Sequence, residues 1–362
     1  MTRKLKIFNQ IINQDSKCFF VAEIGANHCG SVKIGKKLID MCKLAGVNAV
    51  KFQKRSNKNL FTKKIYDSLY DNKNSYGRSY GAHREKLELS IKQFKQLKKY
   101  ATKKGLLFMC TPFDLESVTE LETINLEAYK IASADITNLP LIKKIAKTKK
   151  PTFMSTGCAT MPQVIRAHKE FTKINKNLCL MQCTSIYPPK YDQFHLNVID
   201  TYMDKFKNTI IGLSSHESGI AMDLVAYVKG ARVIEKHVTL NRAMKGTDHA
   251  FSLEFVGLKK TIEYLSNAKK AFGSKTKHQM QEEKEKLKKQ VKSIVASKDI
   301  LPHQKIKIED ISFKVNGGDG LDPSYIDKFI GKRIKKKLSK DEPLLVSNIK
   351  NSLMGKKKNS KK

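Results

Sequence analysis

The chain has 362 residues, 40% of them hydrophobic, so it can bury a large core and is longer than a typical single domain. Its 70 Lys and Arg against 34 Asp and Glu give a formal net charge of +36, which invites a nucleic-acid-binding interpretation. The basic residues are spread through the whole chain at helical spacing, with 8% aromatics and no Trp, which favours solvated helix faces over a nucleic-acid surface.

The segment that starts the chain, MTRKLKIFNQIINQD, is too polar for a signal peptide. Nowhere does an apolar run approach the roughly 18 residues that a membrane span needs. The seven cysteines form no CxxC pair and lie in or beside apolar runs, which is typical of reduced thiols rather than of disulfides or a zinc site. We therefore expect a soluble, cytoplasmic protein with no membrane partner.

Short apolar runs rich in β-branched and aromatic residues alternate with longer, lysine-bearing segments of helical period. In chain order, the runs are CFFVAEIG, VNAVKFQ, LLFMCTPF, AYKIASA, PTFMSTG, LCLMQCTS, TIIGLSSH and RVIEKHVT. Strands that alternate with helices predict a parallel sheet, and eight of them between residues 18 and 239 favour a closed (β/α)8 TIM barrel over an open doubly wound sheet. No GxGxxG follows the first strand and no GxxxxGK[ST] occurs, which disfavours dinucleotide and P-loop sites.

Polar side chains end nearly every predicted strand, and a barrel of this kind builds its active site there. Side chains two apart in a strand point to the same side, so we expect them to enter the barrel mouth together. The pattern is clearest in the last two strands, with Ser214 and His216 in one and Glu235 and His237 in the other. The other strand-end residues are Glu23 and Gly25, Lys51 and Gln53, Thr111, Lys130 and Ser133, Ser155 to Gly157, and Gln182 and Thr184.

The strand-end lysines and hydroxyl groups suit an anionic ligand. Lys51 and Lys130 supply positive charge, and a hydroxyl can donate a hydrogen bond to a phosphate oxygen. We expect them to form a cationic, hydroxyl-rich floor for a phosphorylated carboxylate, together with Thr111, Ser133, Ser155 and Ser214.

His216 and His237 are predicted to lie on neighbouring strands, within reach of one metal ion. Two neutral imidazoles with open water positions suit Mn²⁺, Co²⁺ or Zn²⁺ acting as a Lewis acid on a carbonyl oxygen. The alternative is that each histidine only makes hydrogen bonds. Glu23 also has two interpretations, as a base or carboxylate clamp and as a structural residue.

Several segments in order resemble the sialic acid synthase family, enzymes that make N-acetylneuraminate and related nonulosonic acids. They are FFVAEIGANHCGS, KFQKRS, AYKIASADITNLPLI, PTFMSTG, LMQCTSIYP, IGLSSHESGIA, VIEKHVTL and KGTDHAFSLE, and the resemblance runs from about residue 16 to residue 350. The segment NSYGRSYGAHREKLELS, in the long connection after the second strand, resembles the animal-type and related bacterial branch. A connection of this length is usually a lid or binding loop.

The resemblance implies condensation of phosphoenolpyruvate with an open-chain amino sugar: N-acetylmannosamine, its 6-phosphate or a relative. It implies a divalent metal on His216 and His237, Mn²⁺ before Mg²⁺ or Co²⁺, that polarises the aldehyde oxygen. Phosphoenolpyruvate would be held by the six lysine and hydroxyl residues named above. The sugar would contact Glu23, Gln53, Asp135, Tyr187 and Asp248, with Glu23 as the base for the attacking water.

The resemblance also divides the chain. It implies a catalytic barrel over residues 1–272, a linker over 273–292, a small antifreeze-like (SAF) domain over 293–350 and a basic, disordered tail over 351–362. We expect a homodimer in which each small domain covers the barrel mouth of the other subunit.

The resemblance fails at one position in the small domain. In the bacterial type, an arginine of that domain reaches the sugar, and the matching position here is Val315. Arg78 and Arg84, in the long connection, would then hold a sugar 6-phosphate, or else are ordinary exposed arginines.

Three other functions stay open. A legionaminate or pseudaminate synthase would carry the same motifs. Other phosphoenolpyruvate-condensing barrels, which make seven- or eight-carbon acids, share the chemistry but usually lack the C-terminal domain. The non-enzyme alternative is nucleic-acid binding.

Overall fold

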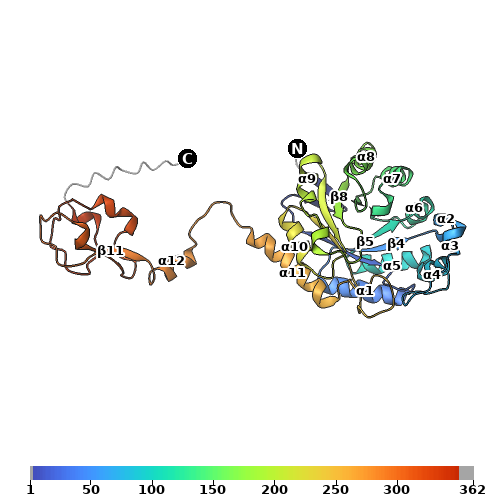
Figure 1. Ribbon diagram of the computed structural model, residues 1–362, viewed down its shortest axis with the longest axis horizontal. Coiled ribbons are helices and arrows are strands. Elements are labelled where there is room, and N and C mark those ends of the chain that lie inside the picture. Colours follow the sequence, from blue (N-terminus) through green and yellow to red (C-terminus); the bar gives the residue numbers. More distant parts are fainter. Residues whose placement is uncertain (1–2, 350–362) are drawn as a thin grey trace. The chain divides into compact units, whose positions relative to one another are not determined.

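The structure is a computed structural model that describes residues 3–349. Its chain divides between Gly273 and Ser274 into two compact units; in Figure 1 the first runs from blue to the light orange of its last helix, and the second from orange to red. The predicted basic tail, residues 351–362, lies outside the described residues. The two units are described separately below.

The first unit contains a closed barrel of eight parallel strands, as the alternating pattern predicts. The last strand pairs with the first, since Val233 to His237 lie beside Phe19 to Glu23. The (β/α)8 prediction is confirmed, because an open sheet would leave these two strands apart. The barrel strands are β3 (Phe19–Gly25), β4 (Ala49–Lys54), β5 (Leu107–Pro112), β6 (Ala128–Ile131), β7 (Thr152–Ser155), β8 (Leu178–Cys183), β9 (Ile210–Ser215) and β10 (Val233–His237).

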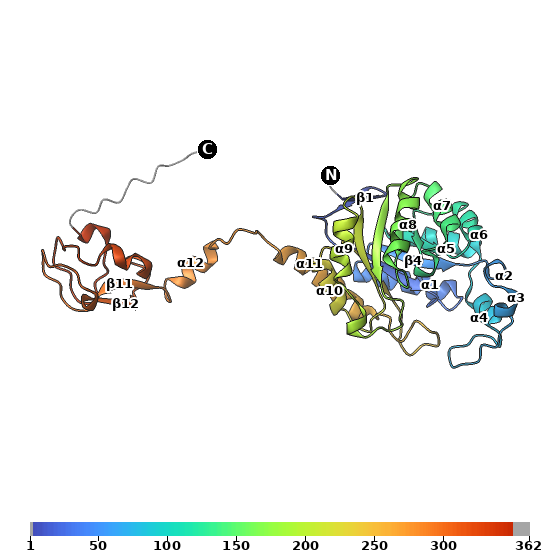
Figure 2. The ribbon, with the colours of Figure 1, turned by 45° about the horizontal axis from the view of Figure 1, so that its top comes forward.

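Helices surround this barrel, as Figures 1 and 2 show, and their apolar faces pack on the outer side of the strands. The aromatic stack of Phe52 on Phe108, with ring centroids 5.0 Å apart, lies in this layer, and Phe94 packs edge-on against both. The covering helices are α1 (Val32–Ala45), α5 (Ile91–Lys103), α6 (Leu115–Glu122), α7 (Leu139–Lys147), α8 (Met161–Thr172), α9 (Val198–Lys205), α10 (Ala221–Val228) and α11 (Phe255–Ala271).

Local signals set the ends of these helices. Ser90 begins α5 with a capping box, in which its side chain and that of Gln93 satisfy each other's backbone N–H groups. Gly46 ends α1 with φ +87°, a conformation that glycine adopts without strain, and its N–H donates to the carbonyls of Cys42 and Lys43. The long connection after β4 carries three short helices, α2 (Asn57–Leu60), α3 (Lys63–Tyr66) and α4 (Tyr80–Leu87).

An N-terminal hairpin, which the sequence reasoning did not anticipate, closes one end of the barrel. It consists of β1 (Lys4–Ile7) and β2 (Gln10–Asn13). Its buried residues Leu5, Ile7 and Ile12 pack with the apolar side chains inside the barrel. These are Phe19, Val21, Ala49, Met109, Ala128, Phe153, Cys179, Met181, Ile210 and Val233. The lower barrel is therefore a dry, filled core, which leaves the opposite end for a polar site.

The second unit is small. It contains α12 (Gln281–Leu287), an antiparallel pair of β11 (Lys292–Ala296) and β12 (Ile311–Val315), and 3₁₀ turns at residues 308–310, 323–328 and 346–348. Its core consists of Ile294, Ala296, Ile300, Ile306, Ile311, Phe329, Ile334, Leu338, Leu344 and Ile349. Among the helices of residues 3–349, none is both long and apolar enough to cross a membrane.

The plug role of the hairpin predicts a stability difference between two of its residues. Leu5→Ala removes a fully buried side chain and should lower the free energy of unfolding by about 2–5 kcal/mol, because it leaves a cavity at the base of the barrel. Ile11→Ala, at a position that is 60% exposed, is the matched control and should change it by well under 1 kcal/mol. Urea denaturation followed by circular dichroism measures both, and equal losses would contradict the plug.

Candidate active site

A cavity of about 390 Å³ opens at the carboxyl ends of the barrel strands, above the apolar core. Strand register brings its side chains to one level, because His237 lies beside Glu23, Glu23 beside Lys51, and Glu235 beside Ser214. The sequence-predicted residues that line the cavity are Glu23, Lys51, Gln53, Thr111, Lys130, Ser133, Ser155, Tyr187, Ser214, His216, Glu235 and His237. The convergence expected of the strand ends is therefore present for these residues.

Two lysines and two glutamates form a buried charge cluster on the cavity floor. Lys51 Nζ lies 2.5 Å from Glu23 and donates to Thr111 Oγ1 at 3.0 Å. Lys130 Nζ donates to Glu235 Oε1 at 2.7 Å, and Ser214 Oγ donates to the same oxygen at 3.1 Å. All these side chains are less than a tenth exposed, so their charges act through a medium of low polarity.

Glu235 organises this cluster. The sequence pattern predicts it in the mouth beside His237 but gives it no chemical role there. Burial alone would raise its pKa, but Lys130 and Lys51 outweigh burial and lower it. Burial likewise opposes the charge of Lys51, while Glu23 and Glu235 raise its pKa overall. The spacing of two between Glu235 and His237 on the same strand does indicate that both face the cavity. An acidic residue is not expected in a binding region for an anion, so this spacing alone does not suggest its role.

Hydroxyl groups cover a second wall of the cavity. Ser155 Oγ and Ser185 Oγ are buried and have no hydrogen-bond partner among the described residues, while Ser133 Oγ accepts the N–H of Gly157 at 3.0 Å. A Cβ at Gly157 would lie 2.2 Å from Ser185 Oγ and 2.8 Å from Ser133 Oγ, so only glycine fits there. Within residues 3–349, the unpartnered hydroxyls of Ser155 and Ser185 suit a ligand with several acceptor oxygens.

The expectation for β8 was wrong by one residue. Gln182 and Thr184 were expected in the mouth, yet Gln182 donates to the carbonyl of Phe194 and Thr184 to that of Gln193. Cys183 and Ser185 line the cavity instead. The physical reason is the alternation of the strand, since Cys179 and Met181 already occupy the inward positions below them.

The two histidines face each other across the mouth with ring centroids 5.5 Å apart. His216 Nδ1 donates to the carbonyl of Thr184 at 3.0 Å, which leaves its Nε2 free to accept or to bind a metal. Burial is the main cause that lowers the pKa of both imidazoles, against the opposing effect of nearby acidic groups. Both are therefore neutral at pH 7, the form that coordinates a cation.

The two histidines would supply few protein ligands to a metal ion. Within residues 3–349, no group of three or more His, Cys, Asp or Glu side chains has the spacing of a metal site. His216 and His237 supply two nitrogen ligands, and His237 Nδ1 is buried without a hydrogen-bond partner, 3.9 Å from Asp248. Two imidazoles beside a cavity fit a cation that keeps several positions for water or substrate oxygens.

Comparisons with known proteins agree with this geometry. Residues 38–277 match the model of the NeuB family, and residues 291–350 match that of the SAF domain. The chain belongs to the NeuB family.

The chain is similar to curated relatives and to a solved structure over most of its length. It is 34% identical to the human N-acetylneuraminate-9-phosphate synthase over 91% of each chain. It is 36% identical to the N,N'-diacetyllegionaminic acid synthase of Campylobacter jejuni, covering 90% of this chain and 98% of that one. A crystal structure of the N-acetylneuraminic acid synthetase of Leptospira borgpetersenii, in complex with citrate, superposes with a TM-score of 0.70 at 30% identity, covering 79% of this chain and 96% of that one.

Four of the residues that were assigned to the sugar or its phosphate in this NeuB family protein are not among those that line the cavity. Asp135 lies in the turn after β6 and accepts a hydrogen bond from Asn138, and burial is the main cause that raises its pKa. Asp248 lies at the rim, near His237. Arg78 is exposed, and Arg84 lines a small pocket beside the cavity, together with Gly25, Gln53 and Arg55.

Because Glu235 is buried, we expect its substitution to lower stability more than the loss of a surface ion pair does. Glu235→Gln leaves Lys130 and Lys51 less well neutralised and should lower the free energy of unfolding by about 3 kcal/mol, since one partner of a buried charge cluster is lost. The control is Asp200→Asn, which breaks a surface pair with Lys229 and should cost below about 1 kcal/mol. The measurement is urea denaturation at pH 8, and a variant of Glu235 as stable as the control would refute the organising role.

Proposed function

We propose that this protein is a nonulosonic acid synthase that condenses phosphoenolpyruvate with the open-chain aldehyde of N-acetylmannosamine, its 6-phosphate or a related amino sugar, and releases phosphate. One observation carries the proposal: two lysines, a wall of hydroxyls and two neutral histidines converge on one cavity of a NeuB family barrel. The names of the relatives, which include N-acetylneuraminate-9-phosphate, legionaminic and pseudaminic acid synthases, support the same reaction class. Legionaminate or pseudaminate precursors are the alternative sugars.

The lysines and hydroxyls form the binding region for phosphoenolpyruvate. Lys51 and Lys130 point into the cavity and are held in place by Glu23 and Glu235. Thr111 is fixed by Lys51, and Ser214 by Glu235, so four groups are ordered before any ligand arrives. Ser155 is buried without a partner and supplies a further hydroxyl to an incoming phosphate or carboxylate oxygen.

In the reaction, carbon 3 of phosphoenolpyruvate attacks the aldehyde carbon and forms the new C–C bond. Water adds at carbon 2, and the resulting tetrahedral intermediate breaks its C–O bond to phosphate. Glu23 would accept the proton of that water; its carboxylate lies in the cavity wall and accepts a hydrogen bond from Gln53 Nε2 at 2.7 Å, which supports this role. Gln53 and Tyr187, which line the cavity, would orient the sugar hydroxyls, together with Asp135 and Asp248 outside its lining.

His216 and His237 would hold a divalent metal, Mn²⁺ before Mg²⁺ or Co²⁺. When bound, such an ion polarises the aldehyde oxygen as a Lewis acid. A second argument is charge, because the two lysines and two glutamates formally cancel, so that an anionic substrate needs additional positive charge in the cavity.

The test is a phosphate-release assay with phosphoenolpyruvate and a panel of amino-sugar aldehydes, phosphorylated and unphosphorylated. We expect release only when both substrates are present, loss of turnover after chelation, and recovery on adding Mn²⁺. His237→Ala should reduce kcat by more than about 1,000-fold while phosphoenolpyruvate still binds in calorimetry, because the lysines and hydroxyls remain. Absence of release with every aldehyde would refute the function, and full activity of the histidine variant would refute the metal.

We also propose a cytoplasmic homodimer in which each SAF domain covers the partner's cavity. Exposed apolar side chains support an interface on this domain, since Phe313 and Val315 of β12 are 40% and 47% exposed. Analytical ultracentrifugation should give twice the mass of one chain at micromolar concentration, and Phe313→Glu should shift it toward the monomer because a charge cannot be buried there. The control is Lys314→Glu, on the opposite face of the same strand; a monomeric wild type would contradict the dimer.

A further inference from the structure

Two arginines beside the cavity have no carboxylate partner. Arg55 follows β4 and Arg84 lies in α4, and no ion pair of either guanidinium exists within the described part of the chain, residues 3–349. Both line the same small pocket, which also contains Gly25, Gln53 and Glu88, a carboxylate that is already bound to Lys54 and to the backbone N–H of Arg55. This differs from the lysines of the floor, each of which is paired with a glutamate.

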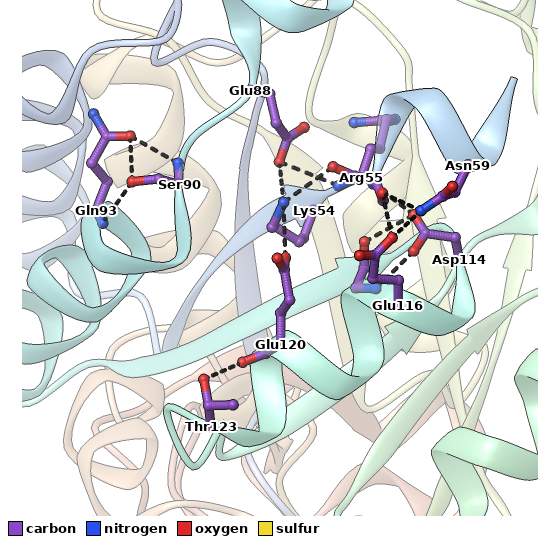
Figure 3. A network of polar contacts seen from close by, with 12 residues as sticks. Lys54, Arg55, Asn59, Glu88, Ser90, Gln93, Asp114, Glu116, Glu120 and Thr123 are labelled. Carbon is purple, nitrogen blue, oxygen red and sulfur yellow. Dashed lines mark hydrogen bonds and ion pairs between the residues drawn. The ribbon is translucent and has the colours of Figure 1, made fainter.

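The carboxylates nearest the backbone of Arg55 are all bound to other groups, as Figure 3 shows. Lys54 Nζ lies between Glu88 and Glu120, at 3.1 and 3.2 Å, and Glu88 also accepts the backbone N–H of Arg55. Asp114 accepts the N–H of Ser56 and caps α6. The fold thus neutralises Lys54 with two carboxylates and leaves the adjacent guanidinium with none.

The guanidinium of Arg55 is held in place by two neutral side chains. Its Nη2 donates to Gln53 Oε1 at 2.7 Å, and its carbon lies 3.7 Å from the centre of the Phe113 ring. Gln53 and Phe113 both line the main cavity. Stacking and one hydrogen bond orient the planar group and leave most of its N–H donors for a ligand.

Arg84 lines the same small pocket as Arg55, from helix α4 of the long connection after β4. Its Nε and Nη2 both donate to Tyr80 Oη, at 3.0 and 2.9 Å, so it is fixed without being neutralised. Burial, with the like charge of Arg84 second, lowers the pKa of Arg55 to about 10, so the group stays charged at pH 7.

We propose that Arg55 and Arg84 together bind a phosphomonoester on the amino sugar, at the end remote from its aldehyde, so that the enzyme selects phosphorylated over unphosphorylated sugars. This inference rests on the proposed function. Two fixed, unneutralised guanidiniums in one pocket repel each other, and a dianion with three oxygens removes that repulsion while accepting paired hydrogen bonds. The phosphate of phosphoenolpyruvate is a less suitable occupant, because the lysine floor and the hydroxyl wall already provide for it.

The experiment compares kcat/KM for N-acetylmannosamine 6-phosphate and N-acetylmannosamine, at saturating phosphoenolpyruvate. Wild type should favour the phosphorylated sugar at least 10-fold. Arg55→Gln and Arg84→Gln should each lower kcat/KM for that sugar by about 10–100-fold, since each loses charge-assisted hydrogen bonds, and leave the unphosphorylated sugar and the KM of phosphoenolpyruvate within about 2-fold. The matched control is Lys86→Gln, which removes one exposed positive charge from the same helix and should change neither sugar.

A binding measurement separates this inference from the function itself. Calorimetry with the open-chain alcohol made by reducing N-acetylmannosamine 6-phosphate requires no turnover, and wild type should bind it at least 10-fold more tightly than either arginine variant. Equal loss for both sugars, an equal effect of Lys86→Gln, or no preference in wild type would overturn the inference while the synthase activity stands. Absence of phosphate release with every aldehyde would instead overturn the function.

Discussion

The site depends on one carboxylate that lies between two ammonium groups inside a closed barrel. Glu235 on β10 bonds Lys130 of β6 and Ser214 of β9, and it lies 3.6 Å from Lys51 of β4. Such a cluster is stable in a low-polarity interior only if every charge has a partner at short range. Closure of the sheet provides those partners, because it brings strands distant in the sequence around one axis. The same contacts then orient the lysines for a ligand.

Most of the barrel and the inner half of the site could be predicted from the sequence, because both depend on local periodicity. Apolar runs separated by helical segments predicted the eight strands, and spacing by two predicted that Lys51 and Gln53, or Ser214 and His216, share one cavity. This reasoning needs only the strand direction and the knowledge that parallel barrels place their sites at one end.

What was missed depends on information that local patterns do not contain. At the end of β8, either set of alternate residues could face the cavity, because Gln182 and Thr184 are polar and so is Ser185. Only the packing of Met181 in the inner core shows that Cys183 and Ser185 point inward. The N-terminal hairpin is short and half polar, so its role as a plug follows from the space that it fills. Arg55 gives no signal in the sequence, because an arginine after a strand is ordinary. That it forms no ion pair within residues 3–349 is visible only in the structure, where Glu88 and Glu120 both pair with Lys54.

The two cationic regions of the mouth therefore differ in kind. The lysines are neutralised by glutamates, so they contribute orientation and hydrogen bonds more than net charge, and an anion placed on them needs a further cation nearby. The arginines are ordered by neutral groups, a glutamine amide, a phenyl ring and a tyrosine hydroxyl, and keep their full charge. A ligand anion gains most from the unneutralised pair, because no protein carboxylate has to be displaced from it. Under the proposed function, selection among sugars by charge is thus expected at the rim, while the floor, whose charges cancel, would hold the groups of the bond-forming step.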